Sequence, residues 1–347
     1  MISKHHFSVL LFLGVLSTFL FTACKTNSGD VELQEENRKS DSISNILNSP
    51  ELKAVNAELL QAPDNAELYH KRASVYLKLK LLAEAVNDSK RAIRLDSAVV
   101  KYYLTLADVY FSQNNTRLSK ELLEITVTKF PDNIEALLKL SELYFLVQKY
   151  QKGIDFVNKA LKMDAHLAKA YYIKGSIYRE SGDTAKAISS LETAVEQDNT
   201  YEDAYYDMGV IYAARRNPLA LDYYQNVLRI NPENQNAKYA RAKLLQDLGK
   251  TDEAIKEYDV ILSTNKTCAN CYYNLGAIYL ELKKDPEKAL EQFTKAIECD
   301  PNYVEAYFAR AYTYTKLKDK ESAKADYNMC LKIQPNFEGA IQGLNEL

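Results

Sequence analysis

The stretch that decides the fold is Ala204-Tyr205-Tyr206-Asp207-Met208-Gly209-Val210-Ile211-Tyr212, in which a glycine stands between tyrosines. A small residue returns at the place of this glycine along most of the chain, at intervals of 33 to 35 residues. The small residues are Ala73, Ala107, Ser141, Gly175, Gly209, Ala242, Gly276 and Ala311. The sequence therefore repeats itself with a period of about 34 residues, from Ala66 to about Phe337.

The other recurring positions predict helices. A tyrosine follows the small residue by three positions in seven of the eight repeats, and a ring or large apolar residue usually precedes it by four. A second small residue comes later in each repeat, usually with a large residue four positions further on, such as Leu191 or Phe293. Offsets of three, four and seven are typical of amphipathic helices. Because turn residues such as Ser181-Gly182-Asp183 divide the repeats, each repeat is predicted to hold two helices.

This pattern resembles the tetratricopeptide repeat. Residues 204–212 and 271–279 match the first helix of that family closely, with tyrosine in place of tryptophan, which the chain lacks. The resemblance implies an all-α, right-handed superhelical solenoid, because a single helix pair cannot bury its own apolar face and must stack on neighbours. We count eight helix-turn-helix repeats: 66–99, 100–133, 134–167, 168–201, 202–234, 235–268, 269–303 and 304–337.

Short capping helices are expected at both ends of the repeats. In residues 50–65, Ser49-Pro50 offers an N-cap followed by proline at the first helical position. The apolar stripe of this helix consists of Leu52, Val55 and Leu59. At the other end, residues 338–347 carry Ile341 and Leu344 at helical spacing and are expected to form a closing helix.

The N-terminal residues 1–23 carry the pattern of a secretory signal, with an apolar run from Phe7 to Phe21 that is too short to span a membrane. The following Ala23-Cys24 resembles the lipobox of bacterial lipoproteins, although Phe21 departs from the usual leucine. The resemblance implies acylation of Cys24, and an ordinary secretory signal is the alternative. Residues 24–49 are polar and acidic and are expected to form a flexible tether.

By the same resemblance, the predicted location is the bacterial cell envelope, with a lipid anchor in the bilayer. Lys25 stands where an aspartate commonly marks retention in the inner membrane, so the outer membrane is favoured. The sequence leaves the choice between the periplasmic and the outer face open.

Composition argues against several classes of function. The formal net charge is -3, and the basic residues form no stripe that would neutralise phosphates of a nucleic acid. Beyond residues 1–23 only His70 and His166 remain as histidines, in different repeats, and the glycines form no phosphate-binding cluster. We therefore expect no enzymatic activity, no cofactor, no small-molecule substrate and no nucleic-acid partner.

Four cysteines leave one chemical alternative open. Cys268 and Cys271 form a C-x-x-C pair, whereas Cys299 and Cys330 replace core residues of later helices. The pair is compatible with a local disulfide, with part of a metal site, or with a redox-active dithiol, although a zinc site needs four ligands and no histidine is nearby. A thiol-redox or metal-binding protein is therefore the alternative to a scaffold.

The family resemblance also implies where a partner binds. In tetratricopeptide solenoids the first helices line a concave groove, and the residue after the first ring faces inward. In this chain these residues are His70, Leu104, Leu138, Tyr172, Tyr206, Tyr239, Tyr273 and Phe308. Leu104, Phe111, Leu138, Phe145 and Leu146 are expected to give repeats two and three an apolar floor. Apolar and aromatic anchors of this kind carry binding energy at interfaces, although tyrosine is also a common family residue at this position.

The function predicted from these observations is a lipid-anchored scaffold that binds a protein or peptide segment in its groove to assemble or recruit an envelope complex. Similar repeat lipoproteins suggest a pilotin or an adaptor for cell-wall enzymes. The carboxylate-binding pattern of chaperone-tail adaptors is not matched, since only Asn274 stands at its place, while Tyr239 and Lys243 occupy the positions of Lys and Asn. The sequence leaves monomer and dimer open. It also predicts an irregularity or hinge at 215–290, where spacing and repeat residues depart from the pattern.

Overall fold

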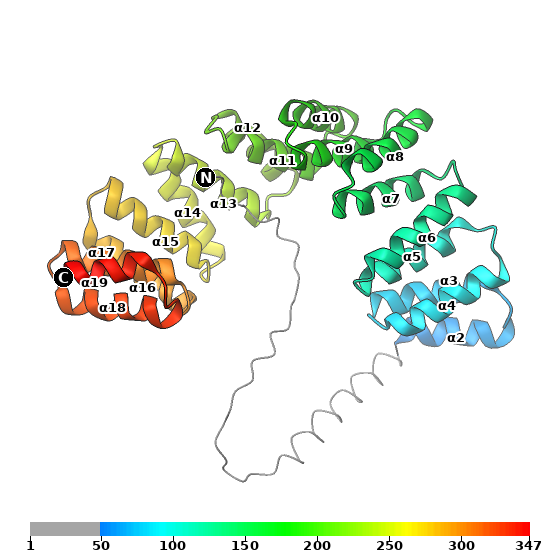
Figure 1. Cartoon of the computed structure of the whole chain (residues 1–347), viewed down its shortest axis with the longest axis horizontal. Helices are drawn as coiled ribbons and strands as arrows, with labels where there is room; N and C mark the ends of the chain where they lie inside the picture. Colours follow the sequence, from blue (N-terminus) through cyan, green and yellow to red (C-terminus); the bar gives the residue numbers. More distant parts are fainter. Residues whose placement is uncertain (1–48) are drawn as a thin grey trace, which may run out of the picture. The chain divides into compact units, whose positions relative to one another are not determined.

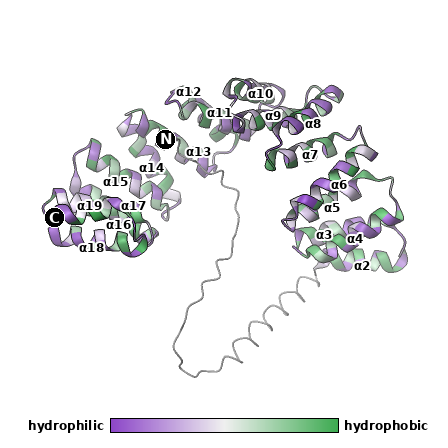
Figure 2. Ribbon diagram, in the orientation of Figure 1, coloured by the Kyte–Doolittle hydropathy of each residue, from purple (hydrophilic) through white to green (hydrophobic). Residues whose placement is uncertain are grey.

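The computed structural model describes residues 49–347, and every regular element in this range is a helix. The chain forms two compact units, of which the first ends at Asp96 and the second runs from Ser97 to Leu347 (Figure 1). Each helix carries both hydrophilic and hydrophobic residues along its length (Figure 2), as expected for helices that bury one face. The predicted all-α class is confirmed.

The described part of the first unit, residues 49–96, contains the helices α2 (Pro50–Gln61), α3 (Ala66–Lys78) and α4 (Leu82–Leu95). The Oγ atom of Ser49 accepts a hydrogen bond from the N–H of Leu52 at 3.4 Å, so the predicted N-cap is present. The predicted apolar stripe of α2, which includes Leu52, Val55 and Leu59, is buried against α3. An opening helix therefore covers the first repeat at the predicted place.

The second unit contains seven further helix pairs and a closing helix. Each helix contacts its neighbours in the chain, which is the packing expected of a repeat stack. The first helices of the pairs are α5 (Val100–Ser112), α7 (Ile134–Leu146), α9 (Ala168–Glu180), α11 (Glu202–Ala213), α13 (Gln235–Asp247), α15 (Ala269–Ala277) and α17 (Val304–Lys316). The second helices are α6 (Thr116–Lys129), α8 (Tyr150–Met163), α10 (Thr184–Gln197), α12 (Leu219–Ile230), α14 (Thr251–Thr264), α16 (Pro286–Cys299) and α18 (Lys320–Ile333).

The closing helix α19 (Glu338–Glu346) packs on α17 and α18. Its buried residue is Ala340, whereas Ile341 is 42% exposed and Leu344 is half-buried. The closing helix is present where the sequence predicts it. The side chains of the expected apolar stripe are less buried than Ala340, because the helix is short and rests on the stack through its small residues.

The turn inside each pair ends the first helix through one left-handed residue. These residues, with φ between 51° and 87°, are Lys80, Asn114, Gln148, Gly182, Arg216, Gly249, Lys284 and Lys318. The N–H of the next residue then donates back to a carbonyl near the helix end, as from Lys149 to the Tyr144 oxygen at 2.8 Å. This is the hydrogen bond of a Schellman motif. The motif fixes the turn even where no glycine is present.

The small residue of the repeat brings the two helices of a pair together. A Cβ atom added at Gly209 would lie 2.5 Å from a ring carbon of Tyr224, and one added at Gly276 would lie 2.5 Å from a ring carbon of Phe293. Both rings come from the second helix of the same pair and are almost completely buried. Glycine therefore allows a ring to lie directly against the backbone of the first helix.

The predicted irregularity in residues 215–290 is confirmed at η1 (Ile278–Leu282), a π-helical turn that continues α15. The repeat spacing here is one residue longer, and the N–H of Asp285 bonds to the Tyr279 oxygen, one residue further back than at the other turns. A π turn absorbs an extra residue without ending the helix. Whether this place acts as a hinge stays a prediction.

Candidate partner-binding surface

Five rings on successive first helices form the candidate surface of the second unit. We call this set the aromatic row, and its members are Tyr172, Tyr206, Tyr239, Tyr273 and Phe308. All five are half-buried, so each has a face in the stack and a face toward solvent. The first helices α9, α11 and α13 also contact one another in sequence, which brings neighbouring members of the row onto adjoining elements.

Each ring of the last four repeats rests on a ring of its own second helix. The centroid distances are 5.9 Å from Tyr206 to Tyr224, 6.1 Å from Tyr239 to Tyr258, 5.9 Å from Tyr273 to Phe293 and 5.9 Å from Phe308 to Tyr327. Such distances fall in the range of favourable aromatic pairs. The row is therefore preorganised by the core beneath it.

A second group of rings, which sequence reasoning missed, lies at the junctions between repeats. Tyr172 lies 5.1 Å from Tyr201, Tyr273 lies 5.2 Å from Tyr303, and Phe308 lies 5.3 Å from Phe337, each measured between centroids. Tyr201, Tyr303 and Phe337 stand one residue before the first helix of the next element. The sequence signal that could have identified them is a ring at the same position, the last residue, of three repeats.

Burial changes the acid strength of the tyrosines in this surface. It raises the pKa of Tyr201 to about 12, and it also raises the pKa of Tyr172 and of Tyr206, with Asp207 adding to the effect at both. These hydroxyl groups therefore stay protonated at neutral pH. They can donate hydrogen bonds to a partner while the ring faces supply apolar contact.

A buried carboxylate lies beside the row. Asp207 is 7% exposed, and its Oδ1 atom is ion-paired with Nη1 of Arg179 from the preceding first helix. Its Oδ2 atom has no hydrogen-bond partner in the described part of the chain. Burial raises the pKa of Asp207, and the guanidinium of Arg179 opposes that rise. Sequence reasoning did not identify this pair, because its partners come from different repeats.

The expected apolar floor of repeats two and three must be corrected. Leu104 and Leu138 are only 4% and 5% exposed, and both belong to the hydrophobic core, so they offer no anchor to a partner. Phe111 and Leu146, in contrast, are 45% and 48% exposed. Phe145 is half-buried, with its ring 6.3 Å from that of Tyr150. The accessible apolar residues of this region are therefore Phe111 and Leu146, with part of Phe145.

The polar residues at two of the positions that a chaperone-tail adaptor uses for its ligand, Asn274 and Lys243, are engaged within the chain. Asn274 is 6% exposed, and its Nδ2 atom donates to the Tyr239 hydroxyl at 2.9 Å. Lys243 pairs with Asp247 at 2.8 Å. The amide of Asn274 thus fixes a ring of the aromatic row.

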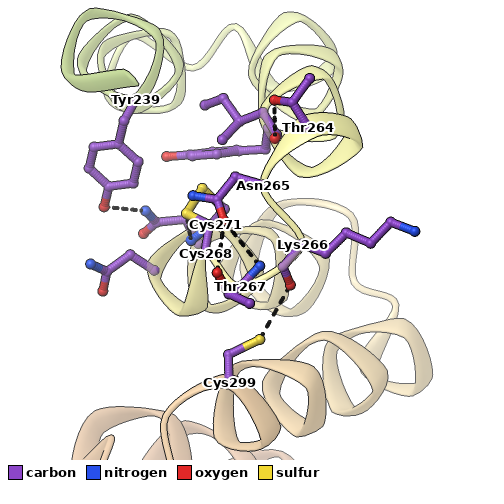
Figure 3. The surroundings of a disulfide bond; sticks show 12 residues. Tyr239, Thr264, Asn265, Lys266, Thr267, Cys268, Cys271 and Cys299 are labelled. Atoms are coloured by element: carbon purple, nitrogen blue, oxygen red, sulfur yellow. Dashed lines mark hydrogen bonds between the residues drawn. A yellow bond between two sulfur atoms is a disulfide. The ribbon is translucent and has the colours of Figure 1, made fainter. Parts of the chain in front are cut away.

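The C-x-x-C pair forms a disulfide between Cys268 and Cys271 at the start of α15 (Figure 3). Cys268 is the N-cap residue of this helix, and its sulfur accepts from the N–H of Cys271 at 3.2 Å. The Sγ atom of nearby Cys299 lies 3.5 Å from the Lys266 oxygen. Burial raises the pKa of the separate Cys330 thiol to about 12. Among the residues that the structure describes, no group of three or more His, Cys, Asp or Glu side chains has metal-binding geometry.

The N-terminal predictions lie outside the described residues. They concern the signal sequence of residues 1–23, the acylated Cys24 and most of the tether. Within residues 49–347, none of the helices combines the length and apolar character needed to span a bilayer.

Comparison with known proteins supports the repeat assignment. Family models described as tetratricopeptide or TPR repeat match residues 66–99, 104–168, 175–214, 212–278, 269–303 and 293–325. Human DnaJ homolog subfamily C member 7 is 26% identical over 305 residues, which are 80% of this chain and 62% of that protein. The Hsp70-Hsp90 organizing protein of Triticum aestivum is 23% identical over 223 residues, covering 61% of this chain and 37% of that protein.

The first three curated relatives are matched over 57% to 62% of their own length. Among solved structures, the C-terminal part of a TPR repeat-containing protein from Cytophaga hutchinsonii is 21% identical and has a TM-score of 0.60, over 69% of this chain and 98% of that one. This likeness concerns the fold. The helix pairs, their period and the matches from residue 66 to residue 325 together show that the chain belongs to the tetratricopeptide repeat family.

Proposed function

We propose that this chain is a non-enzymatic scaffold that binds a protein or peptide segment along the aromatic row. The observation that carries the proposal is the combination of solvent-facing and core-supported faces in the same five rings. Rings that are already fixed lose little side-chain entropy on binding, and tyrosine is enriched among the residues that dominate interface energetics.

The described residues favour recognition over catalysis. His166 is exposed, and its Nδ1 atom lies 2.7 Å from Oε1 of Gln197, a neutral amide that supplies no second catalytic group. The named relatives include a chaperone-organizing protein and DnaJ homologs, which agrees with a binding role at the level of the repeat family. The partner proposed for this chain is inferred from the chain's own surface and not from the partners of these relatives.

We test the row with Tyr206→Ala/Tyr239→Ala and a matched control, Tyr212→Ala/Tyr223→Ala. The control removes two tyrosines that stack on each other at 5.3 Å and do not belong to the row. Both variants are first shown to be folded by circular dichroism. Crosslinking and affinity capture from the envelope fraction should then recover a specific protein with the wild type and the control but not with the row variant. Recovery of the same protein by all three chains would refute the row as the binding site.

We propose further that the scaffold is anchored in the outer membrane of the bacterial envelope through acyl chains on Cys24. The support is the apolar run followed by Ala23-Cys24 and the absence of aspartate at Lys25. Each buried methylene contributes about 0.8 kcal/mol, and two or more chains give stable anchoring. Metabolic labelling with palmitate tests this directly. Label on the wild type and none on Cys24→Ala is expected, and equal label on both would contradict the anchor.

A further inference from the structure

A basic cavity lies beside the turns that join the two helices of the second and of the third repeat, and no residue of the aromatic row lines it. It has a volume of about 410 Å³ and is lined by Thr116, Arg117, Lys120, Glu124, Tyr144, Val147, Lys149 and Lys152. Three elements supply these residues: the first half of α6, the end of α7 and the start of α8. Four cationic side chains therefore surround a single carboxylate.

That carboxylate is already engaged. Glu124 accepts a short hydrogen bond from the Tyr144 hydroxyl and is 3.2 Å from the Lys120 ammonium. The hydrogen bond from Tyr144 lowers the pKa of Glu124, with Lys120 and the charge of Lys152 acting in the same direction, so the group stays ionised at neutral pH. One positive charge of the cavity is thereby balanced.

The remaining cations have little compensation. Arg117 is 3.9 Å from Glu121, and its side chain is 80% exposed, which makes this ion pair weak. Among residues 49–347, Lys149 and Lys152 have no ion-pair partner. The ammonium of Lys152 lies 5.3 Å from the centre of the Tyr144 ring, which holds it near the cavity.

The start of α8 adds backbone donors to the same place. Its N-cap residue is Lys149, which makes no side-chain cap, and its first turn contains no acidic residue. In the described chain, the N–H groups of Tyr150, Gln151 and Lys152 have no acceptor. Each of the other second helices has an Asn or Asp cap or a carboxylate in its first turn. Free N–H groups and the positive end of a helix both favour a bound anion.

We propose that this cavity binds the phosphate group of an organic ligand. Two lysines without an ion pair, the weakly paired Arg117 and the open N–H groups suit a doubly charged oxyanion better than a single carboxylate. The volume lies in the range of pockets for small molecules and exceeds what a bare phosphate fills. The phosphate therefore belongs to a larger molecule, either a soluble phosphomonoester or a phospholipid whose phosphate is a monoester.

The test compares the wild-type chain with Lys149→Gln/Lys152→Gln. The matched control is Lys250→Gln/Lys256→Gln, which removes the same charge from α14, whose N-cap is also a lysine but whose first turn contains Asp252 and Glu253. All four lysines have exposed side chains, so both variants are expected to fold, and circular dichroism checks this.

The first arm is calorimetric titration of the full-length protein with glycerol 3-phosphate. The second is cosedimentation of the Cys24→Ala chain, which has no acyl anchor, with vesicles containing phosphatidic acid and phosphatidylcholine. The cavity variant should weaken binding about twofold to thirtyfold, because it removes two exposed ion pairs with the phosphate. The control should leave binding unchanged.

Saturable binding in the first arm identifies a soluble phosphate ligand, and binding in the second arm alone identifies a lipid head group. The proposal is overturned if the chain with an unchanged cavity binds in neither arm, or if the cavity variant and the control lose affinity equally. Since the proposal concerns residues outside the aromatic row, its outcome is independent of the partner experiment.

Discussion

Phe293→Ala provides the most direct test of how the stack is held together. The ring is completely buried and packs against the backbone of Gly276 and against Tyr273, whose centroid is 5.9 Å away. Removing a fully buried phenylalanine costs about 3–5 kcal/mol, because the lost transfer energy adds to that of the cavity left behind. The matched control is Phe111→Ala, where the ring is 45% exposed, and its cost should stay below about 1.5 kcal/mol.

Urea unfolding followed by circular dichroism measures both changes in the free energy of unfolding. Hydrogen exchange then locates the loss, which for Phe293→Ala should centre on α15 and α16, since repeats interact mainly with neighbours. Equal destabilisation by the two variants would refute the reasoning, because it would mean that burial of the repeat ring does not set the stability of its helix pair. A loss spread evenly over all repeats would contradict the local coupling.

Three other predictions follow from named groups. Burial raises the pKa of Asp207 above its unfolded value of about 3.9. Between the unfolded and the folded pKa, the folded chain binds more protons than the unfolded chain, so its stability falls as the pH rises through that window. The melting temperature of Asp207→Asn minus that of the wild type should therefore increase with pH across the same window. A thiol reagent should modify the half-buried Cys299 before the buried Cys330, and equal rates would contradict the assigned burial. Gln148→Gly should stabilise the chain by about 0.5 kcal/mol and Gly249→Ala should destabilise it by about 1 kcal/mol, since both residues have positive φ; thermal melts showing the opposite signs would be inconsistent with the turn geometry.

The repeat period is enough to predict the helix pairs, since every helix must place its small residue and its ring against a neighbour. The same period does not predict how deeply each side chain is buried. Leu104 and Leu138 occupy the repeat position of Tyr206, yet the shorter aliphatic side chains end within the core, while the phenol extends to the surface.

The contacts between repeats could also not be predicted from the sequence. The ion pair of Arg179 with Asp207 joins residues 28 positions apart, which is not the repeat length, so no periodic pattern indicates it. The basic cavity likewise combines residues from three helices, and its charge becomes evident only when Glu124 is seen to be paired with Lys120 and Tyr144. In contrast, the extra residue near Pro286 was visible in the spacing, and the π turn shows how the chain accommodates it.

The disulfide of α15 joins residues only three positions apart. A loop this short restricts few conformations of the unfolded chain, so by loop-length scaling the link stabilises the fold by about 2 kcal/mol. That contribution is small beside the burial of a ring in each of the last four repeats, at Tyr224, Tyr258, Phe293 and Tyr327. Recombinant production in a reducing bacterial cytosol should therefore yield the same helical stack.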